Sequence, residues 1–80
     1  MDAYNKAIEA NPSNFKAWRN KGFVLASMEH YEEALEAYDN SIEINPEYYY
    51  AWYNKGEALY NLGRYGEATE AYARAAELMV

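Results

Sequence analysis

The sequence predicts an all-α fold in which antiparallel helix pairs stack side by side, with five helices in total. The first observation is an internal repeat of 34 residues, in which Trp18 returns as Trp52 and 15–46 aligns with 49–80 at 13 identities in 32 pairs. The second is a helical spacing of apolar residues, and the third is that proline and glycine fall between the segments with this spacing. A period of this length is typical of small units that bury their apolar faces only against their neighbours.

The five helices are expected at residues 2–10, 14–27, 30–44, 48–61 and 64–79. The first is expected because Tyr4 and Ile8, one helical turn apart, recur at the 34-residue interval within the third. It ends before Pro12, since proline disfavours the helical conformation in the residue that precedes it. Links as short as those between these segments force neighbouring helices to run antiparallel.

The second and fourth helices carry the same packing residues, which are Trp18, Gly22 and Leu25, and Trp52, Gly56 and Leu59. Ser13 or Asn14 can cap the second helix. The glycines allow a neighbouring helix to approach closely. We expect the two tryptophans to be core residues, each of which costs about 3–5 kcal/mol when replaced by alanine.

The third helix combines an apolar stripe with an acidic face. The stripe consists of Tyr31, Ala34, Leu35, Tyr38 and Ile42, at positions i, i+3, i+4, i+7 and i+11. The opposite face, expected to be solvated, consists of Glu32, Glu33, Glu36, Asp39 and Glu43. Pro46 ends this helix in the way that Pro12 ends the first.

The fifth helix carries a similar stripe, made of Ala68, Ala71, Tyr72, Ala75 and Leu78. Gly63 precedes it and can adopt a positive φ at little cost, as a turn within a helix pair requires. The equivalent position in the preceding pair is Glu29. That turn is therefore expected to be strained.

These features resemble the tetratricopeptide repeat family, whose pattern is tryptophan, leucine-glycine, tyrosine, alanine with an aromatic residue four later, and proline. The matching residues are Trp18, Lys21-Gly22, Leu25, Ala34, Tyr38 and Pro46, and then Trp52, Lys55-Gly56, Leu59, Ala68 and Tyr72. The sequence departs from the pattern in both lysines, in both leucines that replace tyrosine, and in Val80, where a third proline would fall. The resemblance covers the whole chain and implies a right-handed α-solenoid. It implies a single domain, 1–80, with the second helix of an incomplete repeat at 1–12 and full repeats at 13–46 and 47–80.

Composition argues against several classes of function. The net charge of −6 argues against nucleic acid or an anionic membrane as a partner. No apolar run approaches the roughly 18 residues of a membrane span. The N-terminus also lacks the basic and apolar stretches of a secretory signal. Because the chain has no cysteine, no disulfide or thiolate metal site can form, and we expect a cytoplasmic location.

Catalysis has little support in the sequence. His30 is the only histidine, and it lies in a predicted turn beside Glu29, Glu32 and Glu33 without the convergent spacing of a zinc site. No glycine-rich phosphate loop is present. We therefore expect a solvated histidine, no cofactor, no metal and no enzymatic activity.

In the tetratricopeptide repeat family, the first helix of each pair lines a concave groove that receives a peptide or a partner helix. The resemblance implies that nine residues line this groove, namely Lys16, Arg19, Asn20, Phe23, Tyr50, Tyr53, Asn54, Glu57 and Tyr60. Their spacing traces one stripe on each helix. Basic groups beside tyrosine rings favour an acidic partner with aromatic or aliphatic residues, and Asn20 and Asn54 can bond to a peptide backbone. The alternative is that the tyrosines only pack between adjacent helices.

Three details limit what the groove is expected to bind. The family's clamp for a C-terminal carboxylate is not expected, because Phe23, Tyr50 and Glu57 stand where the clamp needs polar or basic groups. Lys21 is expected to lie over the Trp18 ring instead of meeting a ligand. The run 48–50 contains three tyrosines that point about 100° apart on a helix and are expected not to form one patch.

The expected function is a non-catalytic scaffold that binds a peptide or protein segment along the groove. The alternative is a structural array segment that self-associates through uncovered terminal helices, without a dedicated ligand. It depends on Tyr4, Ala7 and Ile8 being partly bare and on the apolar stripe of the fifth helix finding a second copy.

Overall fold

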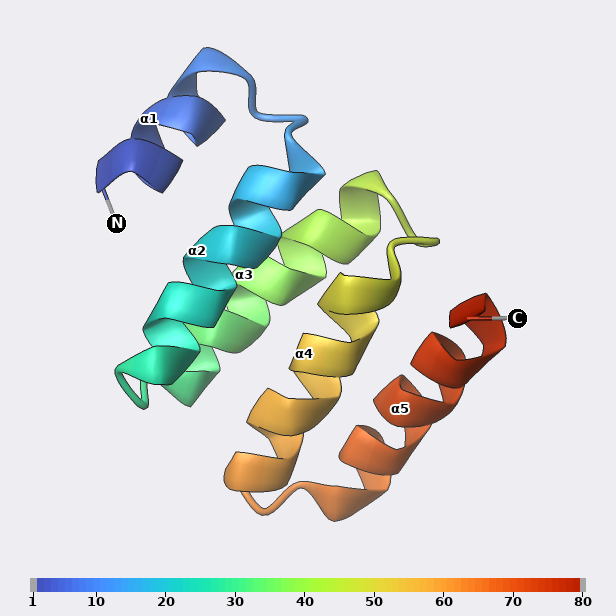
Figure 1. Cartoon of the computed structure of the whole chain (residues 1–80). Helices are drawn as coiled ribbons and strands as arrows, with labels where there is room; N and C mark the ends of the chain where they lie inside the picture. The colour runs from blue at the N-terminus through green and yellow to red at the C-terminus, as the bar shows by residue number, and fades with distance from the viewer. Residues whose placement is uncertain (1, 80) are drawn as a thin grey trace.

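The computed structural model describes residues 2–79, which form five helices and no strand (Figure 1). The helices are α1 (Asp2–Ala10), α2 (Phe15–Ser27), α3 (Tyr31–Ile44), α4 (Tyr49–Asn61) and α5 (Tyr65–Met79). The five predicted helices are therefore confirmed. Four of them, α2 to α5, begin one residue later than predicted. Residues 14, 30 and 48 are the caps that precede α2, α3 and α4.

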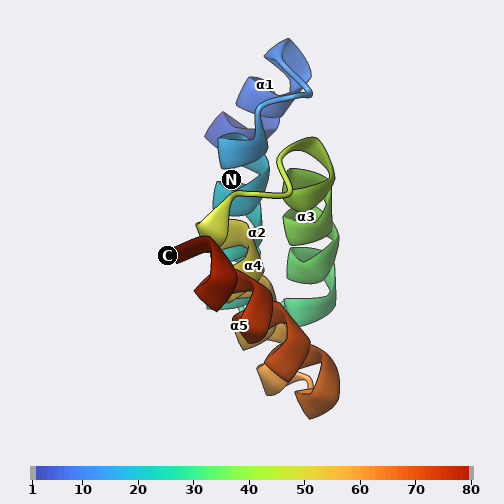
Figure 2. The same cartoon turned by 90° about the vertical axis from the view of Figure 1, so that its right-hand side faces the viewer.

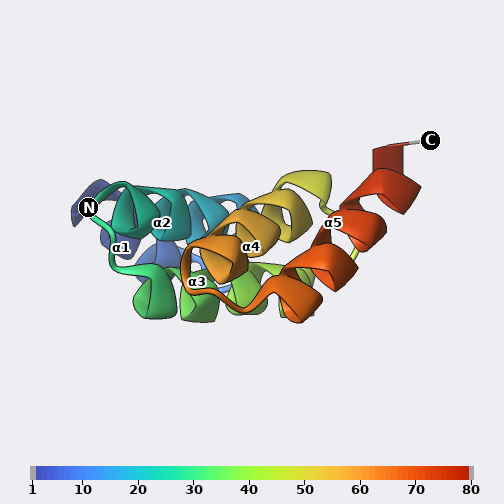
Figure 3. The ribbon, with the colours of Figure 1, turned by 90° about the horizontal axis from the view of Figure 1, so that it is seen from below.

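The helices form two layers. α3 runs back along α2, and α5 runs back along α4 (Figure 1). Figure 2 shows α3 set to one side of α2 and α4, and Figure 3 shows α2 and α4 in one layer with α3 in the other. α2 and α4 contact each other directly, whereas α3 and α5 do not, although both pack on α4. The first helices of the pairs are thus close together, and the second helices diverge.

The turns within the two pairs have the same geometry. The backbone N–H of His30 donates to the carbonyl of Leu25, and that of Arg64 donates to the carbonyl of Leu59, both at 2.9 Å. This closure requires a left-handed residue, which is Gly63 at φ 79° in one turn and Glu29 at φ 63° in the other. The predicted strain at Glu29 is therefore confirmed, at a cost of about 1 kcal/mol.

The core lies between α2, α3, α4 and α5 and is built around one large residue. Tyr38 is only 1% exposed, and the other fully buried side chains around it are mostly alanine and leucine. The ring of Tyr38 lies against Gly22, where an added Cβ would stand 2.5 Å from its Cε1 atom. Gly56 and Tyr72 make the equivalent contact in the next pair, at 2.8 Å. Both glycines thus permit the close approach that the sequence predicts.

The two tryptophans were expected to be core residues. Both are half-buried, and Trp52 packs against the buried core without being part of it. Each indole Nε1–H donates to the carbonyl of the proline in the preceding turn, at 3.0 Å from Trp18 to Pro12 and 2.7 Å from Trp52 to Pro46. The Lys21 ammonium lies 5.4 Å from the centre of the Trp18 ring, as predicted. The tryptophans therefore fasten each turn to the following helix, with one ring face turned toward the surface.

In the apolar stripe of α5, Ala68, Ala71 and Ala75 are buried and Tyr72 and Leu78 are half-buried, so one side of the stripe packs inside the protein and the other is only partly exposed. The exposed side of α5 is the neighbouring stripe, which consists of Tyr65, Thr69, Ala73, Ala76 and Met79. The three α1 residues that we expected to be partly bare are half-buried. The acidic face of α3 is exposed throughout, as predicted.

Candidate protein-binding groove

Six of the nine predicted groove residues form one connected cluster where α2 and α4 meet. The cluster, which we call the inner groove cluster, consists of Arg19, Asn20, Phe23, Tyr50, Asn54 and Glu57. The helical stripe on each helix brings these side chains to the same side, and the direct contact between α2 and α4 brings the two stripes together.

Arg19 is the centre of this cluster. Its Nε atom donates to Oδ1 of Asn54 at 2.6 Å, and one terminal nitrogen donates to Oδ1 of Asn20 at 3.0 Å. The guanidinium carbon lies 5.1 Å from the ring centre of Phe23 and 5.4 Å from that of Tyr50. Two hydrogen bonds and two cation–π contacts therefore hold the guanidinium in one orientation.

Asn54 is occupied by the protein itself. Its side chain is 5% exposed, its oxygen accepts from Arg19, and its Nδ2 donates to Oε1 of Glu57 at 2.9 Å. The expectation that Asn54 offers its amide to a peptide backbone is therefore wrong. The reason is that α2 and α4 are in contact, which brings the Arg19 side chain within reach of Asn54.

A cavity of about 200 Å³ adjoins this cluster on the same side of the molecule. Its lining includes the predicted Phe23, Asn54 and Glu57, together with the unpredicted Ala26 and Ala58. Tyr31 and Tyr38 of α3 also line it, and these residues were missed as groove residues. Their positions at i and i+7 on the apolar stripe of α3 indicated packing, and Tyr38 is indeed buried, so both residues form the floor of the cavity beneath α2 and α4.

The pKa of the Tyr38 phenol is affected by both charged residues of the inner groove cluster. Burial raises its pKa to about 12, while the nearby Arg19 lowers this pKa and Glu57 raises it. Burial also raises the pKa of Tyr72, again with Glu57 acting in the same direction. The two opposite charges of the groove are therefore close to the core that supports them.

The other three predicted residues lie apart from the cluster. Lys16 and Tyr60 are exposed, and the Tyr60 ring packs edge to face on Tyr65 at 5.1 Å. Tyr53 stacks on Tyr49 at 5.8 Å and lies 5.6 Å from Tyr72. Both tyrosines contact neighbouring rings but stay exposed, Tyr53 at 40% and Tyr60 at 59%, so their place in the groove stays a prediction.

The three consecutive tyrosines do form one patch, so the opposite expectation is wrong. The ring centres of Tyr48 and Tyr50 are 5.7 Å apart, and those of Tyr49 and Tyr50 are 5.2 Å apart, with edge-to-face geometry. Phe15 extends the patch, with its ring 4.9 Å from that of Tyr48. Tyr48 precedes the helix as its cap, so the 100° spacing of helical positions does not apply to it.

Residues 2–79 contain neither a cluster of metal ligands nor a membrane-spanning helix. Within them, histidine, aspartate and glutamate side chains form no group of three that could hold a metal, and Nδ1 of His30 lies 3.4 Å from Oε1 of Glu33. A membrane-spanning helix is absent from these residues, whose helices are too short and too polar for one.

Comparisons with protein families agree with this architecture. Two family models, both described as tetratricopeptide repeat, match residues 22–78 and 3–36. A comparison with curated proteins gives no significant match.

Solved structures superpose closely on the chain. A structure of MamA is 32% identical with a TM-score of 0.92, and the match covers 98% of this chain and 46% of MamA. YrrB, a TPR protein with an unusual peptide-binding site, is 28% identical with a TM-score of 0.93 over 98% of this chain and 40% of YrrB. The second TPR of Spaghetti (RPAP3), bound to the HSP90 peptide SRMEEVD, is 25% identical with a TM-score of 0.93, over 96% of this chain and 71% of that one. The chain thus spans less than half the length of MamA and YrrB.

Proposed function

Because this chain belongs to the tetratricopeptide repeat family, we propose that it is a non-catalytic scaffold that binds a protein segment in the groove between α2 and α4. The observation that carries this proposal is the Arg19 guanidinium, which two hydrogen bonds and two aromatic rings fix beside the cavity. Two solved relatives are described with a peptide site or a bound peptide, which supports the same kind of function here. We place the chain in the cytoplasm, because a protein without cysteine gains nothing from an oxidising compartment.

The proposed ligand is a segment that carries acidic residues beside aromatic or aliphatic ones. Lys16 and Arg19 provide two positive charges on α2, against the single negative charge of Glu57 on α4. A carboxylate that meets a fixed guanidinium gains a charge-assisted hydrogen bond and loses little entropy in ordering it. The apolar residue of the ligand would enter the cavity beside Phe23, which is 49% exposed and available for contact.

The test is the binding of a short fluorescent peptide in which glutamate alternates with tyrosine and leucine. Arg19→Glu is expected to weaken binding by about tenfold or more, because it removes the anchoring cation and repels the peptide. Phe23→Ala is expected to weaken binding as well, and it leaves the buried core intact because Phe23 is half-exposed. Fluorescence anisotropy measures both, and circular dichroism checks that each variant is folded.

Lys6→Glu is the matched control, since it makes the same change in charge on the exposed surface of α1. This variant is expected to bind with nearly the parent affinity. Equal losses from Lys6→Glu and Arg19→Glu would mean that only net charge matters, and the groove would be rejected. Chemical-shift changes confined to other surfaces would reject it too.

Self-association is a second candidate function, favoured by the exposed stripe of α5. Tyr65 is 60% exposed and Met79 is 70% exposed, and Ala73 and Ala76 lie exposed between them. Such a stripe, with small residues between two large ones, suits the close approach of an equivalent helix from a second copy. The occupant of this surface would then be another molecule of the same chain.

Sedimentation over a range of protein concentrations tests this candidate. We expect concentration-dependent association that Ala76→Glu abolishes, because a charge would be buried without a partner. Ser13→Glu adds the same charge in an exposed turn and should leave association unchanged. A monomer at every concentration would exclude the second candidate and leave the groove proposal untouched.

A further inference from the structure

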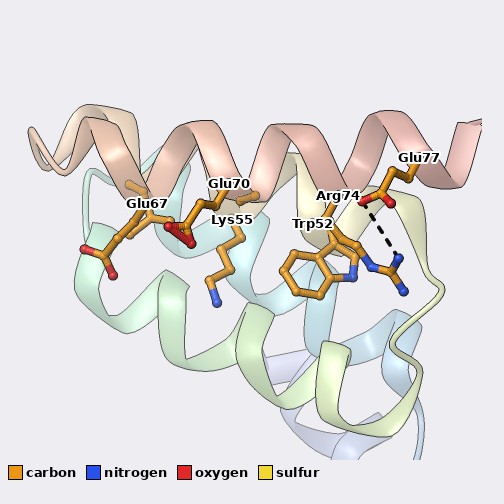
Figure 4. Close-up of a pocket in the computed structure, with 8 residues that line it drawn as sticks. Trp52, Lys55, Glu67, Glu70, Arg74 and Glu77 are labelled. Carbon is orange, nitrogen blue, oxygen red and sulfur yellow. Dashed lines mark ion pairs between the residues drawn. The ribbon is translucent and has the colours of Figure 1, made fainter.

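A larger cavity lies on the opposite side of the molecule from the inner groove. Its volume is about 480 Å³, and its lining consists of Trp52, Lys55, Leu59, Glu67, Glu70, Ala71, Arg74 and Glu77. Figure 4 shows the Trp52 and Lys55 side chains beneath α5, which carries the three glutamates and Arg74. We call it the Trp52 cavity. It opens where α3 and α5 diverge over α4.

A second cavity of about 230 Å³ repeats this arrangement one period earlier. Its lining, which defines the Trp18 cavity, consists of Trp18, Lys21, Leu25, Glu33, Glu36, Ala37 and Asn40. Six of these seven residues have the same residue type 34 positions later in the Trp52 cavity, and only Asn40 differs, where the later repeat has Arg74. In each cavity a lysine ammonium lies about the same distance from the indole ring, 5.4 Å and 5.5 Å. The cavity is therefore a feature of the repeat unit.

Charge separates the two layers of the molecule. The layer of α2 and α4 carries four basic residues and one acidic residue, which are Lys16, Arg19, Lys21, Lys55 and Glu57. The layer of α3 and α5 carries eight acidic residues and one basic residue, which are Glu32, Glu33, Glu36, Asp39, Glu43, Glu67, Glu70, Glu77 and Arg74. The rims of the two outer cavities belong to the acidic layer.

Most charges in the Trp52 cavity are already paired. Lys55 lies 2.8 Å from Asp39, and Arg74 lies 4.0 Å from Glu77. Glu67 accepts two hydrogen bonds from Arg64, just outside the cavity. Within residues 2–79, the exposed Glu70 and its counterpart Glu36 make no ion pair. The Trp52 cavity thus presents one carboxylate without a cation beside its indole ring. In the Trp18 cavity Glu36 has no cation, and Glu33 contacts only His30.

We propose that the outer cavities form a second docking surface, which binds a basic segment with aliphatic and aromatic side chains. An arginine or lysine of the segment would pair with Glu36 or Glu70, and an apolar side chain would cover the half-buried indole. An acidic segment is disfavoured here by the eight carboxylates of the layer. The chain would then hold partners of opposite charge on its two sides. This inference uses residues that the inner groove does not use.

The probe is a short labelled peptide in which arginine alternates with leucine and tyrosine. The two tryptophans provide one indole N–H signal for each outer cavity, so NMR can follow the two sites separately. Both signals are expected to shift on titration, and the affinity is expected to fall as salt is raised. Glu36→Lys combined with Glu70→Lys should weaken binding by about tenfold or more.

The matched control is Glu32→Lys combined with Glu43→Lys, which makes the same change in charge on exposed residues of the same layer outside both cavities. It should weaken binding by no more than about threefold, since it alters only the long-range attraction. Arg19→Glu should leave the basic peptide bound, whereas it releases the acidic one.

Two outcomes would contradict the proposal that the outer cavities bind a basic segment. One is an equal loss of affinity in the two double variants, which would mean unspecific attraction to an acidic face. The other is a peptide that leaves both indole signals in place. Neither outcome concerns binding of the acidic peptide at Arg19, so the two proposals fail independently.

Discussion

Replacing Tyr38 by alanine is expected to lower the free energy of unfolding by about 3–5 kcal/mol, the usual cost of deleting a buried aromatic ring. Tyr38 is 1% exposed and is the largest fully buried side chain of the described residues. A chain of 80 residues has a total stability of roughly 4–12 kcal/mol, so this single change can remove most of it. Urea unfolding followed by circular dichroism measures the loss.

Tyr72→Ala is the matched comparison, because Tyr72 is the same residue one period later but is only half-buried. Its cost should be clearly smaller. Equal costs would contradict the assignment of Tyr38 to the centre of the core.

The same residue makes stability sensitive to alkaline pH. The folded-state pKa of Tyr38 is raised to about 12, above the ordinary value of 10.0, so folding favours the neutral phenol. The contribution of the neutral Tyr38 phenol to the free energy of unfolding is fully present below pH 10. It is lost as the pH rises from 10 through 12. The free energy of unfolding of Tyr38→Phe should therefore fall less than that of the parent over this interval. Parallel curves for the two proteins would contradict the burial of this hydroxyl.

The second large effect is expected at Gly22, where Gly22→Ala should destabilise the chain by about 2 kcal/mol. Alanine in a helix gains about 1 kcal/mol over glycine, and overpacking a core costs up to about 3 kcal/mol. The cost of overpacking is expected to exceed the gain in helix propensity, because the added Cβ would stand 2.5 Å from Cε1 of the fully buried Tyr38 ring and 3.1 Å from the carbonyl oxygen of Ala34. Both residues are fully buried, so relieving the clash would disturb the core.

Two glycines provide the controls. At Gly56 the added Cβ would meet the ring of Tyr72 at 2.8 Å, but this ring is half-buried and can shift, so Gly56→Ala should cost less. Gly66 has no atom within 4 Å of an added Cβ, and Gly66→Ala should stabilise α5 slightly. Thermal unfolding of the three variants should rank Gly22→Ala lowest. A Gly22→Ala variant as stable as Gly66→Ala would contradict the packing of α2 on α3.

The sequence alone predicts the helices, their order and the positions of their turns. These features depend on local causes: the spacing of apolar residues along one segment, the prolines at 12 and 46, and the left-handed turn residue at 29 or 63. It also determined the two stripes that line the inner groove, because the helical period alone assigns residues to one side of a helix. Because the repeat is 34 residues long, a residue assigned to one side of a helix in the first pair predicts the equivalent residue in the next pair.

Which of these side chains remain available to a partner depends on how the helices pack in three dimensions. Asn54 is occupied because α2 and α4 touch, whereas Trp52 stays half-exposed where α3 and α5 diverge over α4. The same divergence opens the Trp52 cavity, and the burial of Ala68, Ala71 and Ala75 leaves a neighbouring stripe of α5 exposed. A helical period fixes the direction of a side chain relative to its own axis. The distance and angle between two axes depend on packing across both helices, and no single segment of sequence contains that information.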